Sequence, residues 1–222
     1  MASAIIHLAV AKKLLDNLKV ENQKDYFLGS IAPDISKQIG SSKVSSHFLI
    51  KTKPDVPNIQ MFVDKYPNFI NNSFDLGYFV HLYTDKLWFD GFLDHLIYNN
   101  SIKLLDGTII ETTEEEMQSM IYSDYTNMNI KLIDKYEMDL SLFYEEFQEP
   151  KTKILEIPTY RLDILVNKMG LLIANSKEEK AYTLDISQVE QFIDQTADII
   201  LKKLHELYKY KTQTIKFDFS YS

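Results

Sequence analysis

Residues 76–89 read Leu-Gly-Tyr-Phe-Val-His-Leu-Tyr-Thr-Asp-Lys-Leu-Trp-Phe, a largely apolar run with a few polar side chains set into it. The spacing of these side chains predicts a long helix over residues 74–92. One stripe of that helix carries the residues of chemical interest: Gly77, His81, Asp85 and Trp88. A small residue at position 77 leaves room for backbone or substrate to approach the stripe.

His81 and Asp85 form the most informative pair in this helix. They are four residues apart, so their side chains are neighbours at about 5–6 Å between Cβ atoms, which suits two ligands of one ion. A hydrogen bond on the helix surface is the alternative. Apolar neighbours such as Val80 and Leu82 favour the metal, because a carboxylate buried among them is costly without a compensating cation.

The same helical periodicity dominates the rest of the chain. Ser3 is a good N-cap for a first helix that turns His7 toward the core, and further helices are expected over 57–66 and 162–173. Capping boxes at Thr113–Glu116 and Ser187–Glu190 begin two more, and the tail from Lys209 is expected to fray.

One hairpin interrupts this helical pattern. Asp106-Gly107, between two apolar pairs, is a turn signal and predicts a small β-hairpin near residues 103–110. No linker or internal repeat divides the chain. The expected fold is therefore all-α, a single multi-helical domain over residues 1–222.

Composition excludes several classes of function. A net charge of −8 gives no general attraction to nucleic acid, so we do not expect a nucleic-acid partner. The chain has no cysteine, so any metal is held by His, Asp, Glu or backbone. No window approaches the ~18 apolar residues of a transmembrane segment, and the N-terminus lacks the pattern of a secretory signal, so a cytoplasmic location is expected.

Common catalytic motifs are also missing. The six glycines form neither a nucleotide-binding loop nor the G-x-S-x-G nucleophile elbow. His205-Glu206 begins like the zinc-protease pattern H-E-x-x-H, but Lys209 stands where the second histidine would be. His205 is therefore read as a surface helix residue.

Three further side chains could join His81 and Asp85 at a metal. His7 lies on an apolar helix face, where a neutral core imidazole is the alternative. Asp34 follows Pro33 in a turn and could simply cap that turn. His47 lies in Ser46-His47-Phe48, within a loop-rich region over residues 21–52.

Together these segments resemble a known family. His7-Leu8-Ala9, FLGSIAPDI at 27–35, Ser46-His47-Phe48 and the run at 76–89 are similar, in order and spacing, to the zinc-dependent phospholipase C family, and the resemblance covers roughly residues 3–92. That family and the related single-strand nucleases are mostly helical and hydrolyse phosphodiesters with clustered zinc ions. The resemblance thus implies a zinc-dependent hydrolase of phosphoric esters.

Carried over by motif, the resemblance implies that Asp34, His47, His81 and Asp85 hold one zinc, and that His7 contributes to a second that shares Asp85. Asp34 would double as the general base that orients the attacking water.

The chain also departs from the family pattern. The family's later His-x-x-x-Glu is missing, and His95 lies about 15 Å beyond Asp85 along a straight helix, so it is read as structural. Asp124 is offered as an additional ligand because aromatic residues flank it, although a solvated helix carboxylate is the alternative. Trp88 is offered as a substrate contact. One or two zinc ions are therefore expected.

Three functional hypotheses fit these observations. The first is a phospholipase C-like hydrolase that acts on a small phosphoester or a phospholipid head group. The second is a non-catalytic helical module with a closed metal site. The third is a nuclease-like phosphodiesterase, with Trp88 and the 14 tyrosines as stacking surfaces, against which the acidic charge argues. The sequence leaves the substrate and the oligomeric state open.

Overall fold

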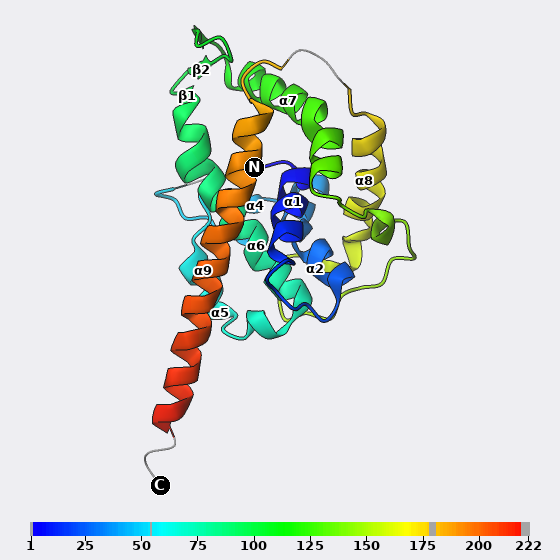
Figure 1. The fold of residues 1–222 in the computed structure, drawn as a ribbon, viewed down its shortest axis with the longest axis vertical. Coiled ribbons are helices and arrows are strands. Elements are labelled where there is room, and N and C mark those ends of the chain that lie inside the picture. The colour runs from blue at the N-terminus through cyan, green and yellow to red at the C-terminus, as the bar shows by residue number, and fades with distance from the viewer. Residues whose placement is uncertain (1, 54, 178–180, 219–222) are drawn as a thin grey trace.

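The computed structural model describes residues 2–53, 55–177 and 181–218, with side chains described as far as residue 209. The expected mostly α-helical fold is confirmed (Figure 1). The longer helices are α1 (Ala4–Leu14), α2 (Gln23–Gly29), α5 (Ile59–Lys65), α6 (Ser73–Leu87), α7 (Glu114–Lys135), α8 (Asp163–Ala174) and α9 (Ile186–Asp218). Two single-turn helices, α3 (Ile35–Gln38) and α4 (Lys43–Ser46), lie in the loop-rich segment.

Shorter helical turns connect these elements. The 3₁₀ segments are Ala32–Asp34, Phe69–Asn71, Leu93–His95, Ser141–Phe143 and Thr159–Arg161. A π-helical turn, Trp88–Phe92, follows α6, so the helix predicted over 74–92 is α-helical only as far as Leu87.

Helices α1 and α6 form the centre of the core. Every side chain from Ile5 to Ala11 in α1 is buried, as is every one from Phe74 to Leu82 in α6. A helix that is apolar all round needs neighbours on every side. α1 packs on α2, α6, α7 and α9, and Figure 1 shows it enclosed by these helices while the far end of α9 projects beyond them.

A close crossing of α2 and α6 depends on two glycines. A Cβ added at Gly29 would lie 2.1 Å from the carbonyl oxygen of Phe74, and one at Gly77 would lie 2.0 Å from that of Tyr26. The room predicted at Gly77 is therefore filled by the backbone of α2. This contact brings the C-terminal end of α2 against the first turns of α6.

The predicted hairpin is present, with a longer loop and a third strand. β2 (Ser101–Lys103) pairs antiparallel with β3 (Ile109–Glu111), and β1 (Ile97–Tyr98) pairs with β2. Lys103 lies opposite Ile109, so the loop has five residues rather than two. Gly107 adopts a φ of 88°, which explains the glycine in the turn.

Helix ends follow the capping predictions at two of three places. Ser3 caps α1, and Thr113 with Glu116 forms the capping box of α7. The box predicted at Ser187–Glu190 is wrong: Asp185 accepts the backbone N–H groups of Ser187 and Gln188 instead, so the helix begins earlier. The tail predicted to fray continues α9 through Asp218.

One hydrophobic cluster contains residues of all the longer helices from α1 to α9. The single domain over residues 1–222 stays a prediction, as does the cytoplasmic location. Within the residues that the structure describes, no helix has both the length and the apolar character needed to cross a membrane.

Candidate metal centre

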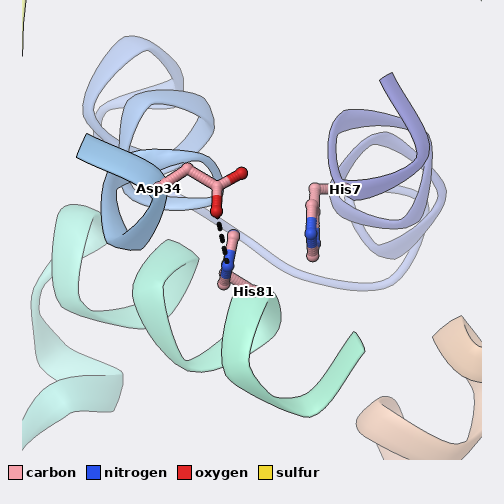
Figure 2. Close-up of side chains that lie close together, drawn as sticks. All are labelled: His7, Asp34 and His81. Carbon is pink, nitrogen blue, oxygen red and sulfur yellow. Dashed lines mark ion pairs between the residues drawn. The ribbon is translucent and has the colours of Figure 1, made fainter. Parts of the chain in front are cut away.

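Four chain segments bring five metal-binding side chains together. His7 comes from α1, Asp34 from the 3₁₀ turn before α3, His47 from the residue after α4, and His81 and Asp85 from α6. His7, His81 and Asp85 are fully buried, and His47 is 2% exposed. Figure 2 shows His7 and Asp34 on separate segments beside His81.

Three ligand atoms, on His47, His81 and Asp85, lie close enough together to bind one ion, and Asp34 lies beside the two histidines. The Nε2 atoms of His47 and His81 are 3.3 Å apart, and each is 3.6 Å from Asp85 Oδ2. Asp34 Oδ1 lies 3.5 Å from His47 Nε2 and 4.0 Å from His81 Nε2. Zinc with N and O ligands at about 2.0–2.1 Å would place those ligands about 3.3 Å from one another. The atoms of His47, His81 and Asp85 therefore could hold one zinc ion, with Asp34 Oδ1 within 4.0 Å of both histidine Nε2 atoms.

His7 approaches the other oxygen of Asp85. Its Nε2 lies 3.4 Å from Asp85 Oδ1, and its ring stacks on His81 with centroids 3.8 Å apart. The ligand atoms of His7, Asp34 and His81 also lie within 4.8 Å of one another. The backbone N–H of Ala2 donates to Asp85 Oδ1 at 3.0 Å. Asp85 thus faces two groups of ligands through different oxygens, as a bridging carboxylate does.

Hydrogen bonds behind the two histidines point their Nε2 lone pairs into the cluster. His81 Nδ1–H donates to the carbonyl oxygen of Ser30 at 2.9 Å. His47 Nδ1 lies 2.9 Å from Ser46 Oγ, whose hydroxyl donates to the carbonyl of Lys43, so the ring nitrogen donates to the hydroxyl. Both bonds leave Nε2 free to bind a cation. Neither serine was predicted to have a role, although Ser30 lies within FLGSIAPDI and Ser46 directly precedes His47.

Several polar atoms of the cluster have no hydrogen-bond partner among the described residues. They are both ring nitrogens of His7, Asp34 Oδ1 and Asp85 Oδ2. Buried polar atoms are nearly always paired, because an unpaired one costs free energy. These atoms surround the spaces where the ligand distances would place cations. The residues present therefore fit zinc.

The electrostatics of the cluster also favour a cation. Burial raises the pKa of Asp85, but His7 and His81 outweigh it and hold that pKa well below its usual value. Burial lowers the pKa of His81, but Asp85 and Asp34 outweigh it, so the pKa is raised. Burial and the neighbouring His81 lower the pKa of His7. These shifts reflect the negative charge of Asp34 and Asp85, which a bound cation would offset.

A cavity of about 200 Å³ reaches one edge of the cluster. Its wall is formed by the start of α1, by α7, by α8 and by the turn that holds Asp34. Asp34 is the one of the five side chains that lines it. The cluster therefore adjoins open space on the side of Asp34.

The comparison with protein families agrees with this geometry. A family model described as zinc dependent phospholipase C matches residues 6–207. The chain belongs to the zinc-dependent phospholipase C family. The match runs well beyond the motifs within residues 3–92 and includes α7 and α8, which line the cavity. No curated protein and no solved structure matches the chain.

Trp88, Asp124 and the two remaining histidines lie outside the cluster. Trp88, offered as a substrate contact, is fully buried and stacks on Phe92, so its ring does not line the cavity beside Asp34. His95 and His205 are exposed, in keeping with their structural interpretation.

Asp124, offered as an additional ligand, is buried and accepts hydrogen bonds from backbone N–H groups. Its Oδ1 accepts the N–H of Tyr182 at 2.7 Å, and its Oδ2 accepts those of Thr183 and Leu184 at 2.8 Å. Its flanking residues correctly indicated a buried carboxylate. Backbone N–H groups, not a metal, neutralise that carboxylate.

The bonds of Asp124 predict that its replacement lowers stability without affecting zinc binding. Asp124→Ala leaves two buried N–H groups and one partly buried N–H group without a partner. Bonds to a charged acceptor contribute about 1.5–3 kcal/mol each. We therefore expect the free energy of unfolding to fall by about 3 kcal/mol or more, with zinc stoichiometry unchanged. Urea denaturation and elemental analysis of the variant check both. Loss of zinc in a variant that remains folded would restore Asp124 as a ligand.

Proposed function

We propose that this protein is a zinc-dependent phosphodiester hydrolase of the phospholipase C type. The observation that carries the proposal is the close set of ligand atoms on His47, His81 and Asp85, with Asp34 beside the two histidines and at the edge of a cavity. Asp34 Oδ1 and Asp85 Oδ2 have no hydrogen-bond partner among the described residues. One ion would be held by this set. A second would lie between His7 and the other oxygen of Asp85.

The chain's own residues suit this chemistry. When bound, zinc would lower the pKa of a coordinated water toward neutrality and polarise the phosphate oxygens. Asp34 borders both the cluster and the cavity, so its carboxylate is placed to orient that water and take its proton. Ser30 and Ser46 keep the imidazoles of His81 and His47 in the tautomer that binds metal. The reaction needs no covalent intermediate on the protein.

The cavity favours catalysis over a purely structural metal. A structural zinc site is closed by four protein ligands, whereas a catalytic site keeps a position open. Asp34 is the longest contact of the set, 4.0 Å from His81 Nε2, and 14% of its side chain is exposed. We propose that this side of the ion takes water and substrate. The substrate is a phosphodiester, either a small phosphoester or a phospholipid head group.

Replacing the proposed base separates catalysis from metal binding. We expect Asp34→Asn to lower turnover about 100-fold or more, because general-base catalysis contributes about 10²–10⁴-fold. Zinc held through the two histidines and Asp85 should remain measurable. The assay is the hydrolysis of bis(p-nitrophenyl) phosphate and of phosphatidylcholine vesicles by zinc-loaded protein, with metal content measured in parallel. If wild-type protein at full zinc occupancy cleaves neither substrate, the hydrolase proposal fails and a metal-binding module replaces it.

A further inference from the structure

The cavity beside Asp34 is small and mostly apolar. Its volume is about 200 Å³. Aliphatic side chains of α1, α8 and the segment before Asp34 form a large part of its wall: Ile5, Ile31, Leu165, Met169 and Leu172. A compact apolar group fits such a wall better than a strongly hydrated one.

One buried amide lacks a partner in this wall. Asn129 of α7 lines the cavity and is 2% exposed. Its Oδ1 has no hydrogen-bond partner within residues 2–53, 55–177 and 181–218. A carboxamide can accept or donate, and leaving it unpaired in an apolar wall costs free energy. A ligand in the cavity that carries one hydrogen-bond donor would therefore satisfy Asn129 Oδ1.

Two lysines add positive charge to the same cavity. Lys37 donates to the hydroxyl of Tyr122 at 2.5 Å, and Lys168 donates to Gln38 Oε1 at 2.7 Å. Both lysines line the cavity, and both of these partners are neutral. Neither lysine forms an ion pair within the part of the chain that the structure describes. In a protein with a net charge of −8, this local excess of positive charge favours an anionic ligand.

We propose that this cavity binds one of the two groups esterified to the substrate phosphate, and that Asn129 selects a compact, mostly apolar group carrying one hydroxyl, which donates to Asn129 Oδ1. Lys37 and Lys168 hold the negative charge of the phosphoester. The assignment of the phosphate to the side of Asp34 rests on the proposed hydrolase function. Asn129 is thus a specificity-determining residue, and the two lysines favour anionic over zwitterionic phosphoesters.

A pair of matched ligands tests the role of Asn129 without relying on turnover. 3-Hydroxypropyl phosphate and n-butyl phosphate have nearly the same size and charge, but only the first has a hydroxyl. In zinc-loaded protein, we expect Asn129→Leu to raise the dissociation constant of 3-hydroxypropyl phosphate by about threefold to tenfold, which corresponds to the loss of one hydrogen bond. The dissociation constant of n-butyl phosphate should not change. Isothermal titration calorimetry measures both dissociation constants.

Two further variants test the charge of the lysines and the volume of the cavity. The double variant Lys37→Met/Lys168→Met should bind both phosphate monoesters more weakly and to the same extent. The salt dependence of binding should also fall, because the variant removes only charge. Leu172→Phe fills the cavity from a partly buried position and should weaken both ligands while zinc content stays unchanged. This last variant keeps the test available if Asn129→Leu does not fold.

The outcomes separate this inference from the proposed function. Equal effects of Asn129→Leu on both ligands, or wild-type binding by Leu172→Phe, would overturn the cavity assignment. So would failure of wild-type zinc-loaded protein to bind either phosphate monoester. If Asn129→Leu weakens binding of 3-hydroxypropyl phosphate alone and wild-type protein hydrolyses no phosphodiester, the cavity assignment is retained and the hydrolase function is excluded.

Discussion

Replacing Asp85 by Asn should greatly lower the affinity of the protein for zinc. Asp85 Oδ2 lies 3.6 Å from the Nε2 atoms of His47 and His81, and its Oδ1 lies 3.4 Å from that of His7. Loss of a hydrogen-bonding residue behind a ligand typically lowers metal affinity about 10–100-fold, and loss of a bridging ligand costs more. We therefore expect zinc affinity to fall by more than about 100-fold, with hydrolysis falling below detection.

Thermal stability gives a second measure of the same change. A ligand present at 100 times its dissociation constant stabilises the folded state by about 2.7 kcal/mol. Wild-type protein should therefore melt at a higher temperature when zinc is added, whereas the melting temperature of Asp85→Asn should not respond. Chelator competition and elemental analysis measure the affinity and stoichiometry directly.

Asp90→Asn is the matched control for this prediction. Asp90 lies five residues beyond Asp85 in the chain and pairs at the surface with Lys53 and Lys86. Exposed pairs of this kind contribute little, about 0–1 kcal/mol. The control should bind zinc as wild type does. Wild-type zinc affinity in Asp85→Asn would exclude Asp85 as a ligand and, with it, the bridged arrangement.

Local periodicity predicted the part of the site that lies on one helix. His81 and Asp85 share a face because they are four residues apart, and the structure places His81 Nε2 3.6 Å from Asp85 Oδ2. The convergence of His7, Asp34 and His47 on that face depends on how distant segments pack. The resemblance to a family indicated that convergence, whereas spacing alone did not.

Trp88 and Asp124 lie outside the cluster for the same physical reason. Trp88 lies on the same stripe as Asp85, but its ring packs against Phe192 of α9, about 100 residues later in the chain. Asp124 is bound by backbone N–H groups from residues 182–184. In both cases the sequence showed that the side chain is buried or shares a face, and tertiary contacts decided its partner.

Asn129 was missed for a related reason. A single asparagine in an amphipathic helix has no distinguishing pattern, and its importance comes from the unpartnered amide oxygen and the cavity around it. The hairpin shows the opposite case. Its turn signal at Asp106-Gly107 is local, so its position was predictable, whereas the five-residue loop depends on the register of β2 and β3.

The largest loss of stability is expected from Gly77→Ala. The new Cβ would lie 2.0 Å from the carbonyl oxygen of Tyr26 and 2.9 Å from the backbone nitrogen of Ser30. Both neighbours are backbone atoms of α2 and its C-cap, so no side chain can rotate away, and the two helices must separate. Overpacking a core costs about 1–3 kcal/mol and sometimes more. We expect about 3 kcal/mol or more here, measured as a lower midpoint of urea denaturation of the zinc-free protein.

Gly170→Ala is the matched control, since a Cβ there would meet only the Tyr144 side chain, at 3.7 Å or more. Alanine favours helix by up to about 1 kcal/mol over glycine, so this variant should be neutral or slightly more stable.

Zinc binding should respond to Gly77→Ala as well. Ser30 accepts the Nδ1–H of His81, and separating α2 from α6 weakens that bond, so zinc affinity should fall about 10–100-fold in variant protein that remains folded. A Gly77→Ala protein with the wild-type denaturation midpoint and zinc affinity would show that the α2–α6 contact does not position the metal centre.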